Sequence, residues 1–107
     1  MEKQISKLEE MKGWLVSTFS HIAILDELYL IGSILNSQSS IFNDIDIVQK
    51  IKFQNYSELK SYGETVNKIK SDFNEKFKIP LHVTTFTQNE LNELYQFMSK
   101  NSYIKLL

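Results

Sequence analysis

The chain has 107 residues, of which 42% are hydrophobic and 23% are charged, and its formal net charge is -1. This length supports one modest hydrophobic core, and the composition excludes wholesale disorder, so we expect a single domain over residues 1–107. The near-neutral charge lacks the basic excess that non-specific binding to nucleic acid or to an anionic membrane requires.

The absent residue types narrow the chemistry further. There is no cysteine, which excludes disulfides and thiolate metal sites. There is no arginine either, so contacts to a phosphate must come from lysine, hydroxyls, backbone N–H groups or a metal ion. No apolar run approaches the roughly 18 residues of a membrane helix, and no signal peptide is visible. We expect a cytoplasmic protein with no membrane partner.

The N-terminal third predicts a helix followed by a buried strand. From Glu2 to about Phe19, apolar residues recur every three or four positions, as on one face of a helix. The short apolar run Leu28–Ile31, which Gly32 and Ser33 end, is typical of a buried strand. The polar stretch 33–40 predicts a short helical turn and then a loop.

The next segment, residues 43–51, predicts a strand with one acidic face and one apolar face. Asp44 and Asp46 alternate with Ile45 and Ile47, and successive side chains of a strand point to opposite sides. Further along the acidic face, Lys50 and Lys52 could either reach phosphates or form a solvated edge.

The C-terminal half predicts a helix, a strand and another helix. Ser57 is a suitable N-cap for a helix that runs to about Phe77. Pro80 stops helical continuation and opens a third strand over residues 81–86. Thr87 is the expected N-cap of a last helix, with Glu90 completing a capping box, and this helix runs to about residue 100. The expected fold is therefore α+β.

The paired aspartates predict a metal site. Asp44 and Asp46 leave the same face of their strand with Cα atoms roughly 6.6 Å apart, at about 3.3 Å per residue. Two like charges at this spacing repel each other, and a divalent cation relieves the repulsion. Mg²⁺ prefers hard oxygen ligands and is commonly held by carboxylates together with substrate phosphates. We therefore expect Asp44 and Asp46 to bind Mg²⁺.

Upstream of the aspartates, Gly32 and Ser33 predict a seat for phosphate. A glycine directly after a buried strand lets the backbone approach a ligand closely. Ser33 would then start a short helix, where free N–H groups and the helix dipole favour a phosphate. The same two residues could instead be an ordinary turn glycine and helix cap.

The combined pattern resembles a known family. Leu30-Ile31-Gly32-Ser33, the ten residues 34–43 and Asp44-Ile45-Asp46-Ile47 together resemble the GSx10DxD signature of minimal nucleotidyltransferases. These are the smallest members of the DNA-polymerase-β-like superfamily, and the resemblance covers residues 28–86. It implies a mixed three- to four-stranded sheet with helices packed on one face and an open acidic cleft on the other.

The resemblance also implies an activity and a partner. Such enzymes transfer a nucleoside monophosphate, here expected to be AMP from ATP, to a hydroxyl, and a domain this small would act on a macromolecule. Many such domains pair with a HEPN-domain toxin and act as antitoxins, so a HEPN-domain protein is the expected partner. The sequence leaves the oligomeric state open.

One position departs from the family pattern. The family usually carries a third carboxylate on the following strand, whereas residues 79–86 contain no acid. His82 is nearest to that position and could act as a base near neutral pH. Two hypotheses stay open: a transferase in which Asp44, Asp46 and His82 are catalytic, or a weak or inactive module that acts by protein–protein contact. The missing acid favours the second, and the intact Gly-Ser and Asp pair favours the first.

Overall fold

The computed structural model describes residues 2–32 and 44–107, without the side chains of residues 2–6. Its elements, in chain order, are α1 (Glu2–Phe19), β1 (Leu25–Ile31), β2 (Ile45–Ile51), α2 (Tyr56–Phe77), β3 (Leu81–Thr87), α3 (Leu91–Ser99) and β4 (Tyr103–Lys105). The expected α+β class is confirmed, and β4 is an addition that the hydrophobic pattern did not indicate. None of the described helices is long and apolar enough to cross a membrane.

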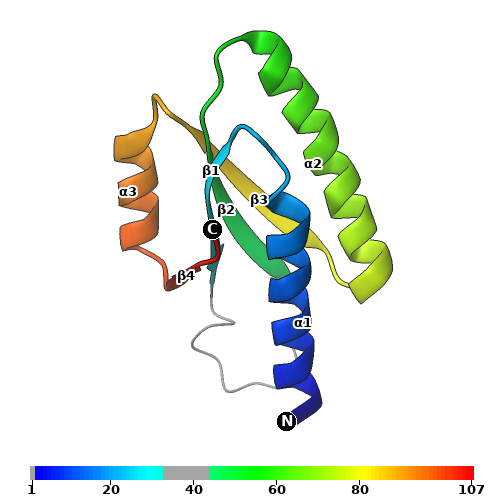
Figure 1. The fold of residues 1–107 in the computed structure, drawn as a ribbon. Helices are drawn as coiled ribbons and strands as arrows, with labels where there is room; N and C mark the ends of the chain where they lie inside the picture. The colour runs from blue at the N-terminus through cyan, green and yellow to red at the C-terminus, as the bar shows by residue number, and fades with distance from the viewer. Residues whose placement is uncertain (1, 33–43) are drawn as a thin grey trace.

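The sheet is mixed, with the strand order β3-β2-β1-β4 (Figure 1). The first strand, β1, pairs antiparallel with both β2 and β4, whereas β2 pairs parallel with β3. A parallel pair needs a crossover connection, and the long helix α2 supplies it. This crossover brings the beginnings of β2 and β3 to the same end of the sheet.

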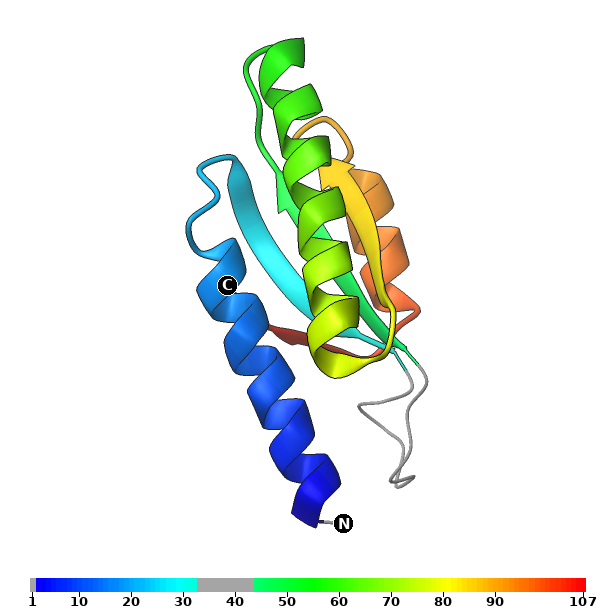
Figure 2. The same cartoon turned by 90° about the vertical axis from the view of Figure 1, so that its right-hand side faces the viewer.

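The helices cover both faces of the sheet, so the expectation that all of them pack on one face is wrong. Helices α1 and α2 lie on one side and α3 on the other (Figure 2). The larger core lies under α1 and α2 and includes Phe19, Leu30, Ile47 and Phe73. The physical reason for the second layer is that β1 and β2 also carry apolar residues on their other face. Ile31 and Val48 are buried there against Leu94 and Met98 of α3.

The helix boundaries differ slightly from those expected. Helix α2 is capped by Asn55 rather than Ser57, because the Asn55 side chain accepts a hydrogen bond of 2.9 Å from the Glu58 N–H. Helix α3 begins at Leu91, after Glu90, so Thr87 is not its N-cap. The Glu90 carboxylate does accept from the Thr87 N–H at 2.9 Å, but residues 87–90 form a turn in which the Glu90 N–H donates to the Thr87 carbonyl.

A buried polar pair ties α2 to the sheet. Gln49 of β2 is fully buried, and its Nε2 donates to Thr85 Oγ1 at 2.9 Å. The Tyr62 hydroxyl of α2 donates to Gln49 Oε1. Burial also raises the pKa of the Tyr62 hydroxyl. Both polar ends of the Gln49 side chain are thus satisfied inside the core.

We expect Tyr62→Phe to lower the free energy of unfolding by about 1–3 kcal/mol, because it leaves Gln49 Oε1 buried without its donor. Denaturant unfolding of both proteins measures this loss. Tyr56→Phe is the matched control, since Tyr56 is 76% exposed and its hydroxyl can remain in water. Equal losses in the two variants would show that the Tyr62 hydroxyl contributes nothing specific.

Candidate functional site

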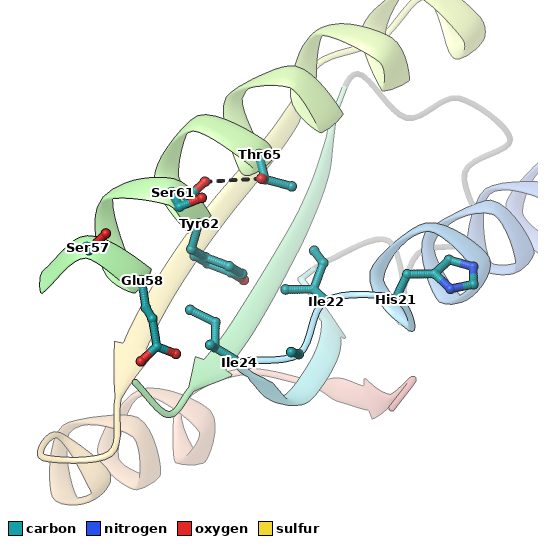
Figure 3. A pocket seen from close by; sticks show the side chains of 9 residues that line it. His21, Ile22, Ile24, Ser57, Glu58, Ser61, Tyr62 and Thr65 are labelled. Carbon is teal, nitrogen blue, oxygen red and sulfur yellow. Dashed lines mark hydrogen bonds between the residues drawn. The ribbon is translucent and has the colours of Figure 1, made fainter. Parts of the chain in front are cut away.

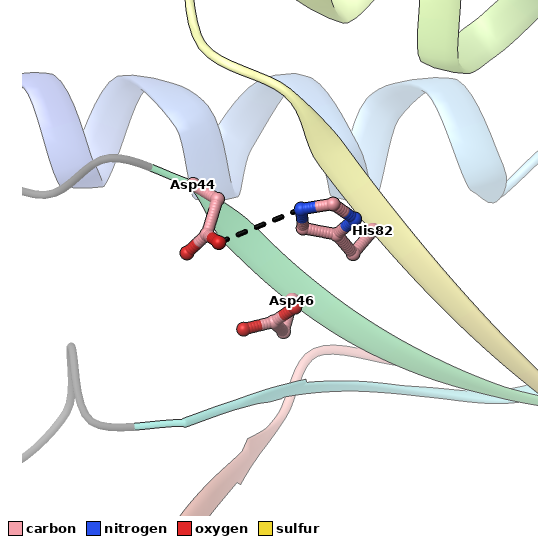
Figure 4. A group of neighbouring side chains, drawn as sticks. All are labelled: Asp44, Asp46 and His82. Atoms are coloured by element: carbon pink, nitrogen blue, oxygen red, sulfur yellow. Dashed lines mark ion pairs between the residues drawn. The ribbon is translucent and has the colours of Figure 1, made fainter.

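Three of the predicted site residues converge at one end of the sheet (Figure 4). Asp44 directly precedes β2, Asp46 is the second residue of β2, and His82 of β3 is the register partner of Asp46. His82 Nε2 lies 3.4 Å from Asp44 Oδ2. One ligand atom from each of the three residues can be chosen so that all lie within 4.8 Å of one another. His82 therefore shares a face of the sheet with both aspartates.

The local fold follows from the apolar residues that alternate with the site. Ile45 and Leu81 are register partners and point into the core under α1 and α2. Side chains alternate along a strand, so burial of these two residues turns Asp44, Asp46 and His82 to the other face. The Ile45 N–H donates to the Pro80 carbonyl at 3.1 Å, which holds the two strands together at this end.

Gly32 lies beside the site at the end of β1. Its φ is +109°, a backbone conformation that favours glycine, and a Cβ built on it would lie 3.5 Å from Asp46 Oδ2. Its N–H donates to the Ser102 carbonyl at 3.1 Å, so this N–H is used in pairing the end of β1 with the chain before β4. A phosphate contact through the Gly32 N–H is therefore not supported. Ser33, the other predicted phosphate ligand, lies outside the described residues.

The electrostatics of the site favour a cation. The pKa of Asp46 is raised, first by burial, then by the negative charge of Asp44, and the nearby His82 opposes this shift. Within the described part of the chain, no lysine forms an ion pair with Asp44 or Asp46. The two carboxylates therefore retain a negative charge that a proton or a metal ion would relieve.

Lys50, which the sequence offered as a phosphate contact, is engaged elsewhere. Its Nζ lies 3.0 Å from Asp26 Oδ2 and 3.7 Å from Glu27 Oε1, both on β1. The hydrogen bond with Asp26 raises the pKa of Lys50. Lys50 therefore pairs across the sheet with acids of β1, and Lys52 is exposed beyond the end of β2.

A hollow of about 450 Å³ lies on the opposite side of the molecule, between the α1–β1 connection and the first half of α2 (Figure 3). The sequence did not indicate it. Its lining includes Ser61, Thr65, Tyr62 and Glu58. The Thr65 hydroxyl donates to the Ser61 carbonyl, as it would in any helix. His21 lies at its rim and is exposed. These groups do not converge on one point, in contrast to the aspartates and His82.

Comparisons with known proteins found no relative of this chain. A scan against family models found no match, and neither the curated proteins nor the solved structures gave one. The fold is a small α+β domain with a four-stranded mixed sheet, and its site is defined by the Asp44, Asp46 and His82 geometry alone.

Proposed function

We propose that this domain is a nucleotidyltransferase that transfers AMP from Mg²⁺-bound ATP to a hydroxyl on a macromolecular partner. The observation that carries the proposal is the convergence of Asp44, Asp46 and His82 beside Gly32. Antiparallel pairing of β1 with β2 makes Ile31 the partner of Asp46. Gly32 therefore lies next to the Asp-x-Asp segment in space.

Asp44 and Asp46 would hold the cation. Their oxygen donors suit Mg²⁺, and the absence of a lysine partner within the described residues leaves their charge available. The ion would neutralise part of the negative charge of the triphosphate. The side chains are about half exposed at Asp44 and partly buried at Asp46, so the pair is accessible to a nucleotide yet shielded on the sheet side.

His82 would act as the base for the acceptor hydroxyl. In the transfer, the acceptor oxygen attacks the α-phosphorus, the bond to the bridging oxygen breaks, and pyrophosphate leaves. The hydroxyl proton needs a base, and an imidazole can accept it near neutral pH. His82 Nε2 lies on the same side of the sheet as both carboxylates, so it is the described residue that we propose for the role of the family's third carboxylate.

A second candidate function has its own support. Residues 79–86 carry no acid where the resemblance leads us to expect one, and the Gly32 N–H donates to the Ser102 carbonyl. Both features favour a domain with weak or no turnover that binds nucleotide and acts by protein–protein contact. On this alternative, a HEPN-domain toxin is the partner we propose, and the domain is its antitoxin.

Removal of the metal ligands tests nucleotide binding. We expect Mg²⁺ with ATP to raise the melting temperature of the wild type, since a ligand at 100 times its Kd stabilises by about 2.7 kcal/mol. Asp44→Asn/Asp46→Asn should lose this shift. Without ligand it should be as stable as the wild type or more so, because the repulsion is gone. Asp72→Asn, an exposed change on α2, is the control.

The outcomes separate the hypotheses. A full ligand shift in Asp44→Asn/Asp46→Asn would place the nucleotide elsewhere and refute the site. If the shift depends on the aspartates, incubation with labelled ATP and host lysate decides between the two functions. A labelled macromolecule that requires Asp46 supports the transferase, whereas binding without label transfer supports the regulatory module.

A further inference from the structure

The donor set at the site differs from the one that Mg²⁺ selects. Asp44 and Asp46 offer carboxylate oxygens, but the third group within reach is the imidazole nitrogen of His82. Carboxylates suit Mg²⁺, whereas imidazole suits zinc and other first-row transition metals. Mg²⁺ also demands near-ideal octahedral geometry and gives up water reluctantly. A mixed set of one nitrogen and two oxygens therefore favours a different ion.

Two of the donors lie close enough together to share one cation. His82 Nε2 and Asp44 Oδ2 are 3.4 Å apart. Two donors bound at about 2.0–2.1 Å to one tetrahedral Zn²⁺ lie about 3.3–3.4 Å apart. Asp46 belongs to the same set within 4.8 Å, so a third donor lies close to the other two.

We propose that Asp44, Asp46 and His82 bind one first-row transition-metal cation, of which Zn²⁺ is the best fit, in preference to Mg²⁺. The inference rests on the same site as the proposed function but not on transfer itself. The two ions give His82 different roles. Mg²⁺ on the aspartates leaves the imidazole free as a base, whereas a metal on Nε2 occupies the lone pair that would accept the proton. Zn²⁺ at this site would therefore block transfer.

The composition of the chain makes the test direct. There are only two histidines and no cysteine, so imidazole ¹H–¹⁵N spectra contain signals from His21 and His82 alone. His21 is also exposed and lines the hollow on the other side of the molecule. We expect Zn²⁺ to shift the His82 ring nitrogens at about one equivalent and to leave those of His21 unchanged. Spectra of the variants His82→Ala and His21→Ala assign the two sets of imidazole signals.

Competition titrations of the full chain with Zn²⁺, Mn²⁺ and Mg²⁺ test the preference. Wild type and His21→Ala should both bind Zn²⁺ more tightly than Mg²⁺. Loss of the nitrogen donor in His82→Ala should weaken Zn²⁺ binding by about 10–100-fold or more. Loss of a residue that only hydrogen-bonds to a metal ligand already weakens metal binding by about 10–100-fold. His82→Asp should bind Mg²⁺ better than the wild type does. The side chain of His82 is more than half exposed, so these variants should fold.

Two results would overturn the inference. One is Zn²⁺ binding that leaves the His82 ring nitrogens unshifted. The other is Mg²⁺ binding as tight as Zn²⁺ binding in the wild type. Neither result touches the proposed function, which the Mg²⁺–ATP shift and its loss in Asp44→Asn/Asp46→Asn test separately. Conversely, Zn²⁺ binding that depends on His82, without any ATP binding, would support the inference and refute the proposal that the domain is a transferase.

Discussion

Replacing His82 by alanine should lower the rate of nucleotidyl transfer by about 10²–10⁴-fold, the usual contribution of a general base. The affinity for Mg²⁺–ATP should change little, because the carboxylates of Asp44 and Asp46 remain. The assay uses Mg²⁺ freed of transition metals, so that the imidazole is available as a base. Single-turnover rates and a separate titration with ATP measure the two quantities.

The pH profile separates a base from a merely structural histidine. If His82 is the general base, the wild-type rate should rise with pH and then reach a plateau. His82→Ala should lack that limb. His21→Ala should retain it and should match the wild-type rate, since His21 lies on the other side of the molecule. Wild-type turnover in His82→Ala would refute the base role.

An inactive wild type would make His82→Asp the informative variant. This change introduces a carboxylate at the position that is in register with Asp46. A gain of transfer activity in His82→Asp would support the view that the histidine has silenced an ancestral site. Such a gain would contradict the base role and favour the regulatory module as the function of the wild type.

Replacing Phe73 by alanine should cost about 3–5 kcal/mol of the free energy of unfolding, the usual loss for a large aromatic residue in a core. Phe73 is fully buried between α2, α1 and the sheet. Its ring centroid lies 5.6 Å from that of Trp14 and 4.8 Å from that of Phe77. Truncation therefore opens a cavity and removes two aromatic contacts.

Denaturant unfolding measures the Phe73 loss, and the total stability of a small domain is only about 5–15 kcal/mol. Phe73→Ala can therefore unfold the chain outright. Phe73→Leu keeps the measurement possible, because it retains most of the volume and should cost less than the alanine variant. Tyr95→Ala, on the exposed surface of α3, should change stability little. A loss below about 1 kcal/mol in Phe73→Ala would contradict the observed packing, given the usual cost of such a truncation.

Several features were readable from local sequence because their cause is local. The three- and four-residue spacing of apolar residues predicted α1 over Glu2–Phe19, which are its observed bounds. Strict alternation predicted the two faces of β2, with Ile45 and Ile47 buried and Asp46 on the other side. The resemblance singled out His82 as the residue nearest to the expected third acid, and the strand pairing puts it in register with Asp46.

Other features could not be predicted from the sequence, because their hydrogen bonds join residues that are distant in the chain. The last strand, β4, has three exposed residues and no apolar pattern. It exists because β1 offers an unpaired edge, where Ile31 pairs with Tyr103 and the Gly32 N–H bonds to Ser102. That bond also uses the Gly32 N–H within the sheet, so this donor does not support the predicted phosphate seat.

The sequence by itself determined which residues carry charge and which carry apolar bulk at helical or strand spacing, and hence the paired aspartates and the class of fold. Only the tertiary structure decided that α3 covers the opposite face, because burial of Ile31 and Val48 there becomes necessary once the sheet has formed. It also decided that His82 lies 3.4 Å from Asp44. Alternation can choose a face, but the register of two parallel strands is set by the packing of Ile45 and Leu81 beneath them.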